Sequence, residues 1–252
     1  MMNGVPVHIE KLSIIRGGKE LYRDFSLDVA ADQVLAVIAP SGLGKTTLLD
    51  FIGGVLPSEN VSITGSAVFG TENTSQRSRP RISYLFQEGL LIQGATVLQN
   101  VAFPLVNVMP VSQAHERAMA FLRQAGLEKK AASYPYQLSG GEKQRTAIVR
   151  AFAYPSQILL MDEAFQSQDL RLKVQLIDLF KTMLADTGRT VLFVTHEIRE
   201  AVSVADRILV MDGSPMTVLL DTENVPDSSY TMISSRASEI EKRIINLLTC
   251  SR

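Results

Sequence analysis

Apolar and polar residues alternate in three segments near the start of the chain. Residues 21–29 show this period of two, which predicts a strand with one solvated face. Residues 5–9 begin a similar strand, and Gly17-Gly18 between the two segments suits a tight hairpin turn. Residues 62–69 alternate again, so we expect one antiparallel sheet in this part of the chain.

Five short runs differ from these segments because nearly every position is apolar. This pattern is typical of strands buried on both faces of a parallel sheet. The runs cover residues 34–38, 82–86, 158–161, 190–195 and 207–211. Helical patterns at residues 45–52 and 170–187 each follow such a run and end at a glycine that can take the left-handed conformation. The alternation predicts an α/β fold with a mostly parallel sheet flanked by helices.

Helical pattern also fills the stretch between the second and third buried strands. Residues 111–132 and 140–153 show it with no apolar strand between them, which predicts a mostly helical insertion over residues 87–155. Residues 221–236 contain Ser, Asp and Pro without a clear period and are expected to form a linker. The short helix predicted after it places four apolar residues on one face, namely Ile240, Ile244, Ile245 and Leu248.

The composition is that of an ordinary globular domain. Of the 252 residues 46% are hydrophobic and 20% charged, and 25 Lys and Arg against 26 Asp and Glu give a net charge of -1. Such a chain has no large positive field for nucleic-acid phosphates. Its single cysteine, Cys250, excludes an internal disulfide framework and a Cys-rich zinc site. We recognise no secretory signal and no apolar run near the ~20 residues of a membrane span, so we expect a cytoplasmic protein.

Residues 39–47 combine small residues with a lysine and two threonines, directly after a buried strand and before a helical pattern. This is the context of a phosphate-binding loop, in which backbone N–H groups at a helix start converge on phosphate oxygens. Lys45 would reach the β and γ phosphates, and the Thr46 hydroxyl would bind Mg²⁺. Ala39 stands where G-x-x-x-x-G-K-[ST] has glycine, and a left-handed backbone there would cost about 1–2 kcal/mol. The loop consists of Ala39, Pro40, Ser41, Gly42, Leu43, Gly44, Lys45, Thr46 and Thr47.

Two carboxylates follow the buried strand at residues 158–161. Asp162 and Glu163 should therefore lie at the carboxyl edge of the sheet, where α/β proteins bind ligands. We expect Asp162 to hold Mg²⁺, directly or through water, and Glu163 to orient and deprotonate the water that attacks the γ-phosphate. Taken singly, the loop is also compatible with a helix-capping surface turn and the acids with a solvated strand end. Their combination favours a nucleotide site.

A second anion-binding helix start occurs at residues 138–145. Ser139 is a capping residue, Gly140 and Gly141 open the helix, and Glu142 lies in its first turn. One nucleotide does not need two such sites. We therefore expect a head-to-tail dimer in which this helix start of one copy covers the γ-phosphate held by Lys45 of the other copy.

These motifs, in this order, resemble the nucleotide-binding subunit of an ATP-binding cassette (ABC) transporter, and the resemblance runs over residues 5–220. It implies a P-loop NTPase core with an antiparallel β subdomain and a helical insertion. By the same resemblance, Gln87 matches the glutamine that senses Mg²⁺ and the transmembrane partner. Asp169 matches the aspartate that crosses the dimer interface, and His196 matches the switch histidine that contacts the γ-phosphate.

The resemblance also divides the chain. Residues 1–220 are expected to form the ABC ATPase domain, with residues 1–86 and 156–220 as the ATP-binding core and residues 87–155 as the helical subdomain. Residues 221–252 remain as a linker and a short C-terminal helix. This short tail and Tyr134-Pro135-Tyr136-Gln137 look most like bacterial importers of the nitrate, sulfonate, taurine and thiamine-precursor group.

Several positions depart from the family pattern. Ala164 stands where proline is usual, and residues 166–168 (Gln-Ser-Gln) replace a small and apolar run before Asp169, so we expect the interface packing to differ. The aromatic residue that stacks on adenine aligns with Arg16, whose guanidinium plane can stack on the base instead. Two alternatives stay open: Arg16 is a solvated turn residue, or Tyr22 is the stacking group.

The resemblance implies an ATP hydrolase that uses ATP and Mg²⁺, dimerises around two ATP molecules and drives a membrane importer of a small solute. The expected partners are a multi-span permease with an extracytoplasmic solute-binding protein, and a second ATPase subunit, either identical or related. The apolar residues of 87–103 are expected partly to contact the permease and partly to pack in the core, with residues 90–92 as the expected contact, and the protein would lie on the inner face of the cell membrane.

Two other functions compete with this one. The first is a nucleotide-binding scaffold of a membrane complex, in which Ala39 and the altered segment at residues 164–168 impair hydrolysis. The second is a non-transport ABC protein that acts on nucleic acid. The single cassette and the lack of a basic bias disfavour the second alternative.

Overall fold

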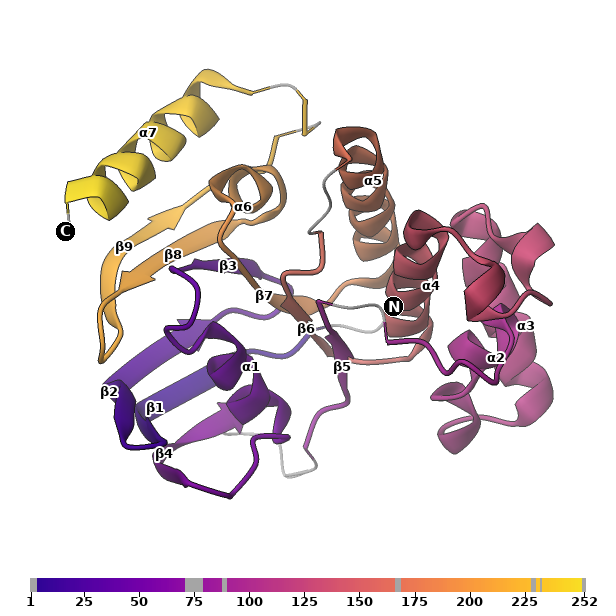
Figure 1. Ribbon diagram of the computed structural model, residues 1–252, viewed down its shortest axis with the longest axis horizontal. Coiled ribbons are helices and arrows are strands. Elements are labelled where there is room, and N and C mark those ends of the chain that lie inside the picture. The colour runs from indigo at the N-terminus through magenta and orange to yellow at the C-terminus, as the bar shows by residue number, and fades with distance from the viewer. Residues whose placement is uncertain are drawn as a thin grey trace.

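In the computed structural model, which describes residues 4–70, 79–87, 90–165, 169–227, 230–231 and 233–250, the chain forms two sheets (Figure 1). The smaller sheet is antiparallel, as predicted, with the order β2-β1-β4. Its strands are β1 (Val7–Arg16), β2 (Lys19–Val29) and β4 (Val61–Phe69). Gly17 and Gly18, with φ of 56° and 79°, make the turn between β1 and β2, which confirms the predicted hairpin.

The larger sheet has the order β5-β6-β7-β3-β8-β9. Neighbouring strands in it are parallel except for β8 and β9, which pair antiparallel. Its strands are β3 (Val34–Ile38), β5 (Ile82–Leu85), β6 (Ile158–Asp162), β7 (Thr190–Thr195), β8 (Arg207–Asp212) and β9 (Thr217–Glu223). The five predicted strands of the parallel core are confirmed, whereas β9 is an element that the sequence analysis did not predict.

Each face of the large sheet packs against its own hydrophobic core. Along β3, Val34, Ala36 and Ile38 belong to a core shared with the helices, while Leu35 and Val37 belong to a core shared with the antiparallel sheet and α1 (Lys45–Gly53). Successive side chains of a strand point to opposite faces, so a strand between two cores must be apolar throughout. This arrangement explains why the central strands appear in the sequence as continuous apolar runs.

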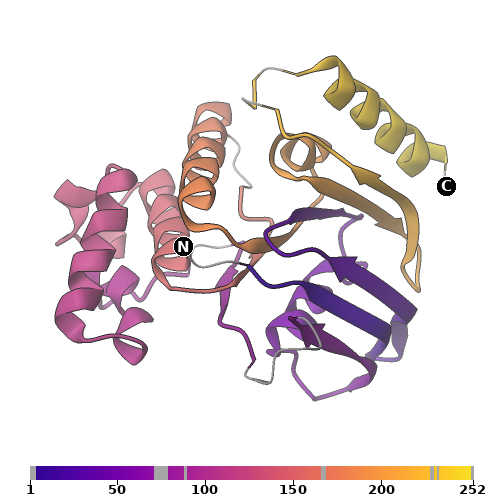
Figure 2. The ribbon, with the colours of Figure 1, turned by 180° about the vertical axis from the view of Figure 1, so that it is seen from behind.

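Helices fill the chain between β5 and β6 and lie together at one end of the molecule (Figure 2). They are α2 (Val97–Ala102), α3 (Val111–Gln124) and α4 (Gly140–Ala153), with the short 3-10 turns η1 (Leu105–Asn107), η2 (Glu128–Lys130) and η3 (Pro135–Gln137). The helical pattern predicted over residues 111–132 corresponds to two elements, α3 and η2. The α-helix ends at Gln124 because Gly126 takes a left-handed φ of 67°, and a separate turn follows.

Arg189, the residue before β7, forms hydrogen bonds to the C-terminal end of α4 and to the segment that follows it. Its buried guanidinium donates hydrogen bonds of 2.7–3.0 Å to the carbonyl oxygens of Ala151, Phe152 and Tyr154 and to Ser156 Oγ. The last carbonyls of a helix have no partners within the helix, and Arg189 supplies a donor to each of these three. The Ala151 oxygen also accepts from Ser83 Oγ, and the Tyr154 oxygen also accepts from the Ser156 N–H. Burial lowers the pKa of Arg189 to about 10, with the nearby Arg117 charge adding to the effect.

The C-terminal segment packs onto the hydrophobic core that the large sheet shares with the helices. Its helix α7 (Ser235–Cys250) begins two residues before the predicted start and buries Ala237, Ile240 and Ile244. Ile245 is exposed, so the prediction that it shares this face is wrong. The predicted linker also begins too early, because β9 continues to Glu223. Among the described residues, every helix is too short or too polar to cross a membrane.

Candidate functional site

An open cavity of about 690 Å³ lies where β3, β6 and β7 end. It brings together most of the residues that the sequence analysis selected, from segments more than a hundred residues apart. Its lining consists of Arg16, Leu21, Ser41, Gly42, Gly44, Lys45, Thr46, Thr47, Gln87, Asp162, Glu163 and His196. Leu21 was not anticipated as a site residue, because its position in an alternating strand gave no sign of which face would meet the cavity.

The loop between β3 and α1 has the backbone that its sequence requires. Gly42 and Gly44 take left-handed φ values of 78° and 111°, which only glycine adopts without strain. Ala39 is not among the described residues with positive φ, so the cost that alanine would bring in a left-handed conformation does not arise. Lys45 is only 5% exposed, and its Nζ donates to the carbonyl oxygens of Ala39 at 2.9 Å and Pro40 at 3.2 Å.

Tyr22 is hydrogen-bonded to the backbone of this loop. Its hydroxyl donates to the Gly44 carbonyl oxygen at 3.1 Å, and its ring is buried, so it is not placed to stack on a base in the cavity. The alternative that Tyr22 replaces the missing aromatic residue is therefore wrong. Arg16, by contrast, is exposed on the cavity wall, where its Nη1 donates to Thr47 Oγ1 at 3.3 Å.

Oxygen atoms suited to a divalent cation meet on one side of the cavity. Thr46 Oγ1 donates to Asp162 Oδ2 at 2.6 Å, and the side chain of Gln87 lines the same space. Burial raises the pKa of Asp162 and the charge of Glu163 adds to this, whereas the Thr46 hydrogen bond acts in the opposite direction. No group of three or more His, Cys, Asp and Glu side chains among the described residues forms a complete metal cage. This donor set suits Mg²⁺, which takes one or two carboxylates and completes its shell with water and phosphate.

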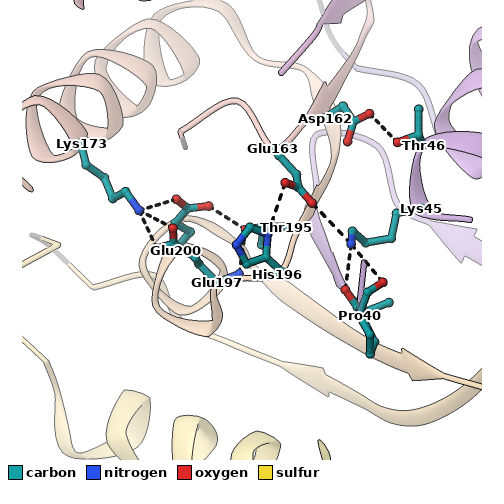
Figure 3. A network of polar contacts seen from close by, with 11 residues as sticks. Pro40, Lys45, Thr46, Asp162, Glu163, Lys173, Thr195, His196, Glu197 and Glu200 are labelled. Carbon is teal, nitrogen blue, oxygen red and sulfur yellow. Dashed lines mark hydrogen bonds and ion pairs between the residues drawn. The ribbon is translucent and has the colours of Figure 1, made fainter. Parts of the chain in front are cut away.

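Glu163 lies between two cationic or potentially cationic groups (Figure 3). Its Oε1 is 3.4 Å from Lys45 Nζ, and its Oε2 is 3.3 Å from His196 Nδ1. The backbone of Glu163 takes a left-handed φ of 46° while its N–H donates to the Val194 carbonyl oxygen at 3.0 Å. A non-glycine residue in this region is strained, and such strain is concentrated at functional sites.

Two predicted segments lie outside this cavity. Ser139 begins α4, where its Oγ accepts from the Glu142 N–H at 3.3 Å and a Glu142 carboxylate oxygen accepts from the Ser139 N–H at 2.8 Å. Asp169 begins α5 (Leu170–Thr187), where its carboxylate accepts from the N–H groups of Arg171 and Leu172 at 2.8 and 3.3 Å. Within one copy of the chain, neither helix start lines the cavity that contains Lys45.

Gly141 shows why the second position of α4 is glycine. A Cβ atom added there would lie 2.5 Å from Leu172 Cδ1 on the neighbouring helix α5, whereas one added at Gly140 would meet nothing within 4 Å. The Leu172 side chain would therefore have to shift to admit a Cβ atom at residue 141. The segment at residues 166–168, where the sequence departs from the family pattern, lies outside the described residues.

A comparison with protein-family models matches residues 22–166 to the family described as ABC transporter. This match covers more than half of the chain. The chain belongs to the ABC transporter family. The solved structure of a dimeric, post-hydrolysis ATP-binding cassette bound to ADP and Pi is 27% identical and superposes with a TM-score of 0.71 over 88% of this chain and 100% of that one.

Relatives of this ABC transporter chain carry the names of import or transport ATP-binding proteins. The Spermidine/putrescine import ATP-binding protein PotA of Vibrio parahaemolyticus is 36% identical over 82% of this chain. The chain spans just over half, 57%, of the length of that relative. The Arginine transport ATP-binding protein ArtM of Bacillus subtilis is 34% identical over 95% of this chain and 100% of its own length. These two names differ in cargo, so the comparisons give the family and not the transported solute.

Proposed function

We propose that this chain binds and hydrolyses ATP with Mg²⁺ and thereby powers a membrane importer of a small solute. The observation that carries the proposal is the cavity in which Lys45, the Thr46–Asp162 pair and Glu163 meet at the carboxyl edge of the large sheet. In this proposal residues 1–86 and 156–220 form the ATP-binding core, residues 87–155 form the helical subdomain, and residues 221–252 form the C-terminal appendage.

The loop residues bind the phosphates. Residues 39–47 present backbone N–H groups at the start of α1, and Lys45 exchanges its carbonyl partners for β- and γ-phosphate oxygens. Thr46, Asp162 and Gln87 hold Mg²⁺, which when bound neutralises phosphate charge. Arg16 lies against the base, where its planar guanidinium stacks on adenine.

Glu163 acts as the general base in this proposal. Its carboxylate is only 13% exposed and is held between Lys45 and His196, so its orientation is restricted before a water molecule arrives. The carboxylate accepts the proton of the water that attacks the γ-phosphate. His196 donates a hydrogen bond to a γ-phosphate oxygen and thereby links the nucleotide to the end of β7.

The second half of each site comes from another copy or from a related subunit. Ser139, Gly140, Gly141 and Glu142 begin an α-helix whose N-terminal N–H groups favour an anion, and they lie away from the cavity of their own chain. Asp169, at the start of the adjacent helix, would cross the same interface. The dimeric form of the similar cassette bound to ADP and Pi supports this arrangement.

An apolar groove supplies the proposed contact with the permease. Phe86, Leu90, Ile92 and Phe103 expose large apolar side chains around a cavity of about 520 Å³ between β5, α4 and the segment after α2. Leu91 between the two exposed residues is buried, so residues 90–92 serve both the core and the surface. An amphipathic helix of the permease would fit this groove. The chain would thus be held at the inner face of the membrane, with an extracytoplasmic protein delivering the solute.

Steady-state release of phosphate from MgATP separates this function from that of a hydrolysis-impaired scaffold. The ordinary backbone of Ala39 removes one reason to expect impaired hydrolysis. The wild-type chain is expected to turn over ATP, and Glu163→Gln is expected to bind ATP with turnover reduced by about 100-fold or more, because the general base is lost. Wild-type turnover equal to that of Glu163→Gln would favour the scaffold.

A further inference from the structure

A buried ion cluster lies next to the turn that carries His196 (Figure 3). Lys173, on α5, is 6% exposed, and its Nζ donates to both carboxylate oxygens of Glu197 at 2.6 and 2.5 Å. The same Nζ is 3.1 Å from Glu200 Oε1, and Glu200 is 2% exposed. One lysine of α5 therefore joins two glutamates that lie at the N-terminal end of α6 (Ile198–Val204).

The cluster continues to both neighbours of His196, through the Thr195 hydroxyl and the Glu197 N–H. Thr195 Oγ1 donates to Glu200 Oε2 at 2.7 Å and accepts from the Glu197 N–H at 3.0 Å. The residue before the histidine and the residue after it are thus both fixed by one connected set of bonds. The His196 side chain is 40% exposed and contacts Glu163 at 3.3 Å, so its place depends on the backbone that carries it.

The charges make Lys173 the centre of this cluster. Burial by itself lowers the pKa of Lys173, but the hydrogen bonds and charges of Glu197 and Glu200 outweigh burial and raise this pKa above its usual value. The lysine therefore remains protonated at neutral pH. A buried ion pair adds little to stability compared with well-packed apolar residues, because desolvation offsets the attraction. Its contribution here is a defined geometry rather than a gain in stability.

We propose that Lys173 is a positioning residue for His196, which by holding Glu197 and Glu200 fixes the turn that places the imidazole beside Glu163 and the γ-phosphate. This inference rests on the function proposed above. Lys173 itself does not line the cavity and touches neither Glu163 nor the loop at residues 39–47 in the contacts of the described residues. In this inference the Lys173 side chain affects hydrolysis through the turn at residues 195–197.

The first test compares kcat and KM for MgATP in the full chain and in three variants. Lys173→Met is expected to lower kcat by about 10- to 100-fold through a misplaced histidine, with KM changed less than about 3-fold. Lys173→Arg keeps the positive charge and is expected to restore kcat to within about 3-fold of wild type. Lys181→Met is the matched control, because Lys181 lies on the same helix and donates to the Asp227 carbonyl oxygen at 2.6 Å, away from the cavity.

The second test asks whether the effect passes through His196. If it does, adding Lys173→Met to His196→Ala changes kcat by less than about 2-fold, because the histidine is already absent. A merely structural role would lower kcat by the same factor in both backgrounds. Should Lys173→Met not fold, the pair Lys173→Met with Glu200→Gln removes the unpaired buried charge and is used in its place, with the fold checked by circular dichroism.

The outcomes separate the inference from the function on which it rests. Loss of kcat in Lys173→Met, recovery in Lys173→Arg and no further loss in the His196→Ala background support the inference. Wild-type turnover in Lys173→Met, or an equal loss in both backgrounds, overturns the inference and leaves the proposed ATP hydrolysis intact. Absence of turnover in the wild-type chain overturns both.

Discussion

The left-handed backbone of Glu163 predicts that a glycine variant is more stable than an alanine variant at this position, which is the reverse of the order at an ordinary helix position. Glu163→Gly and Glu163→Ala both remove the carboxylate that lies 3.4 Å from Lys45 and 3.3 Å from His196, so both lose the same side-chain contacts. They differ in how well they accept the φ of 46° at this position. Alanine remains in the left-handed region with a Cβ atom, whereas glycine adopts it freely.

The size of the difference follows from two opposing effects. The left-handed conformation costs a non-glycine residue about 1–2 kcal/mol. In the opposite direction, glycine lowers the free energy of unfolding by about 0.4–1 kcal/mol relative to alanine, because a glycine variant has more conformational freedom when unfolded. The balance makes Glu163→Gly more stable than Glu163→Ala by about 0–1.6 kcal/mol, and the middle of this range, about 0.8 kcal/mol, is a rise in Tm of about 2–3 °C for a chain of this size.

Thermal and urea unfolding of both variants measure this difference, with Gln113 as the control position. Gln113 is an exposed residue in the first turn of α3 and has no positive φ, and there alanine is expected to be more stable than glycine by up to about 1 kcal/mol. Opposite orders at the two positions are the predicted result. If Glu163→Ala is the more stable of its pair, the left-handed backbone at Glu163 is not a source of strain and the reasoning fails.

Three further predictions follow from the packing and the site. Arg189→Met removes four hydrogen bonds at the end of α4, and urea unfolding should show a loss of about 3 kcal/mol or more; a loss under about 1 kcal/mol contradicts the capping role. Gly141→Ala should be less stable than Gly140→Ala in urea unfolding, because only at residue 141 must the Leu172 side chain shift to admit a Cβ atom; equal effects contradict this contact. Thr46→Val should weaken ATP binding about 10-fold or more in calorimetry with Mg²⁺ and little without it, and equal weakening in both conditions contradicts the Mg²⁺ role.

The parallel core could be predicted because its strands lie between two hydrophobic cores. Residues 34–38, 158–161 and 190–195 are almost entirely apolar for this reason, and strands of this kind can be recognised in a single sequence. The element β9 was missed because an edge strand with one exposed side gives a shorter and weaker pattern. The helix α6 was missed because seven residues are too few to show a helical period.

The site residues that belong to a recognisable motif, or that directly follow a buried strand, could be predicted from the sequence. Lys45 and Thr46 belong to a loop that the spacing of glycines identifies, and Asp162 follows a buried strand whose carboxyl end must lie at the same edge of the sheet. The left-handed backbone of Glu163 was not predictable, because it arises from how β6 ends beside β7. The Lys173 cluster was not predictable either, since it depends on how α5 packs beside α6.

The burial of Tyr22 is a second feature that could not be predicted from the sequence, because it depends on how one strand pairs with its neighbours. The alternating pattern of residues 21–29 indicates a strand with two different faces, but Leu21 lines the cavity while the Tyr22 ring lies in the core. Register shifts between β1 and β2 change which side chains face inward, and they are set by the pairing of the strands. Excluding Tyr22 as the residue that stacks on adenine therefore required the packed structure.

The central claim, a motor subunit that acts on a membrane permease, is tested most directly by recovering the tagged chain from gently solubilised native membranes and identifying its partners by mass spectrometry. The account predicts a multi-span permease with the wild-type chain, its loss with Leu90→Asp in the apolar groove, and its retention with Val68→Asp, an equally disruptive change on the exposed strand β4. Recovery of soluble partners alone, under conditions that preserve other transporters, would contradict the claim.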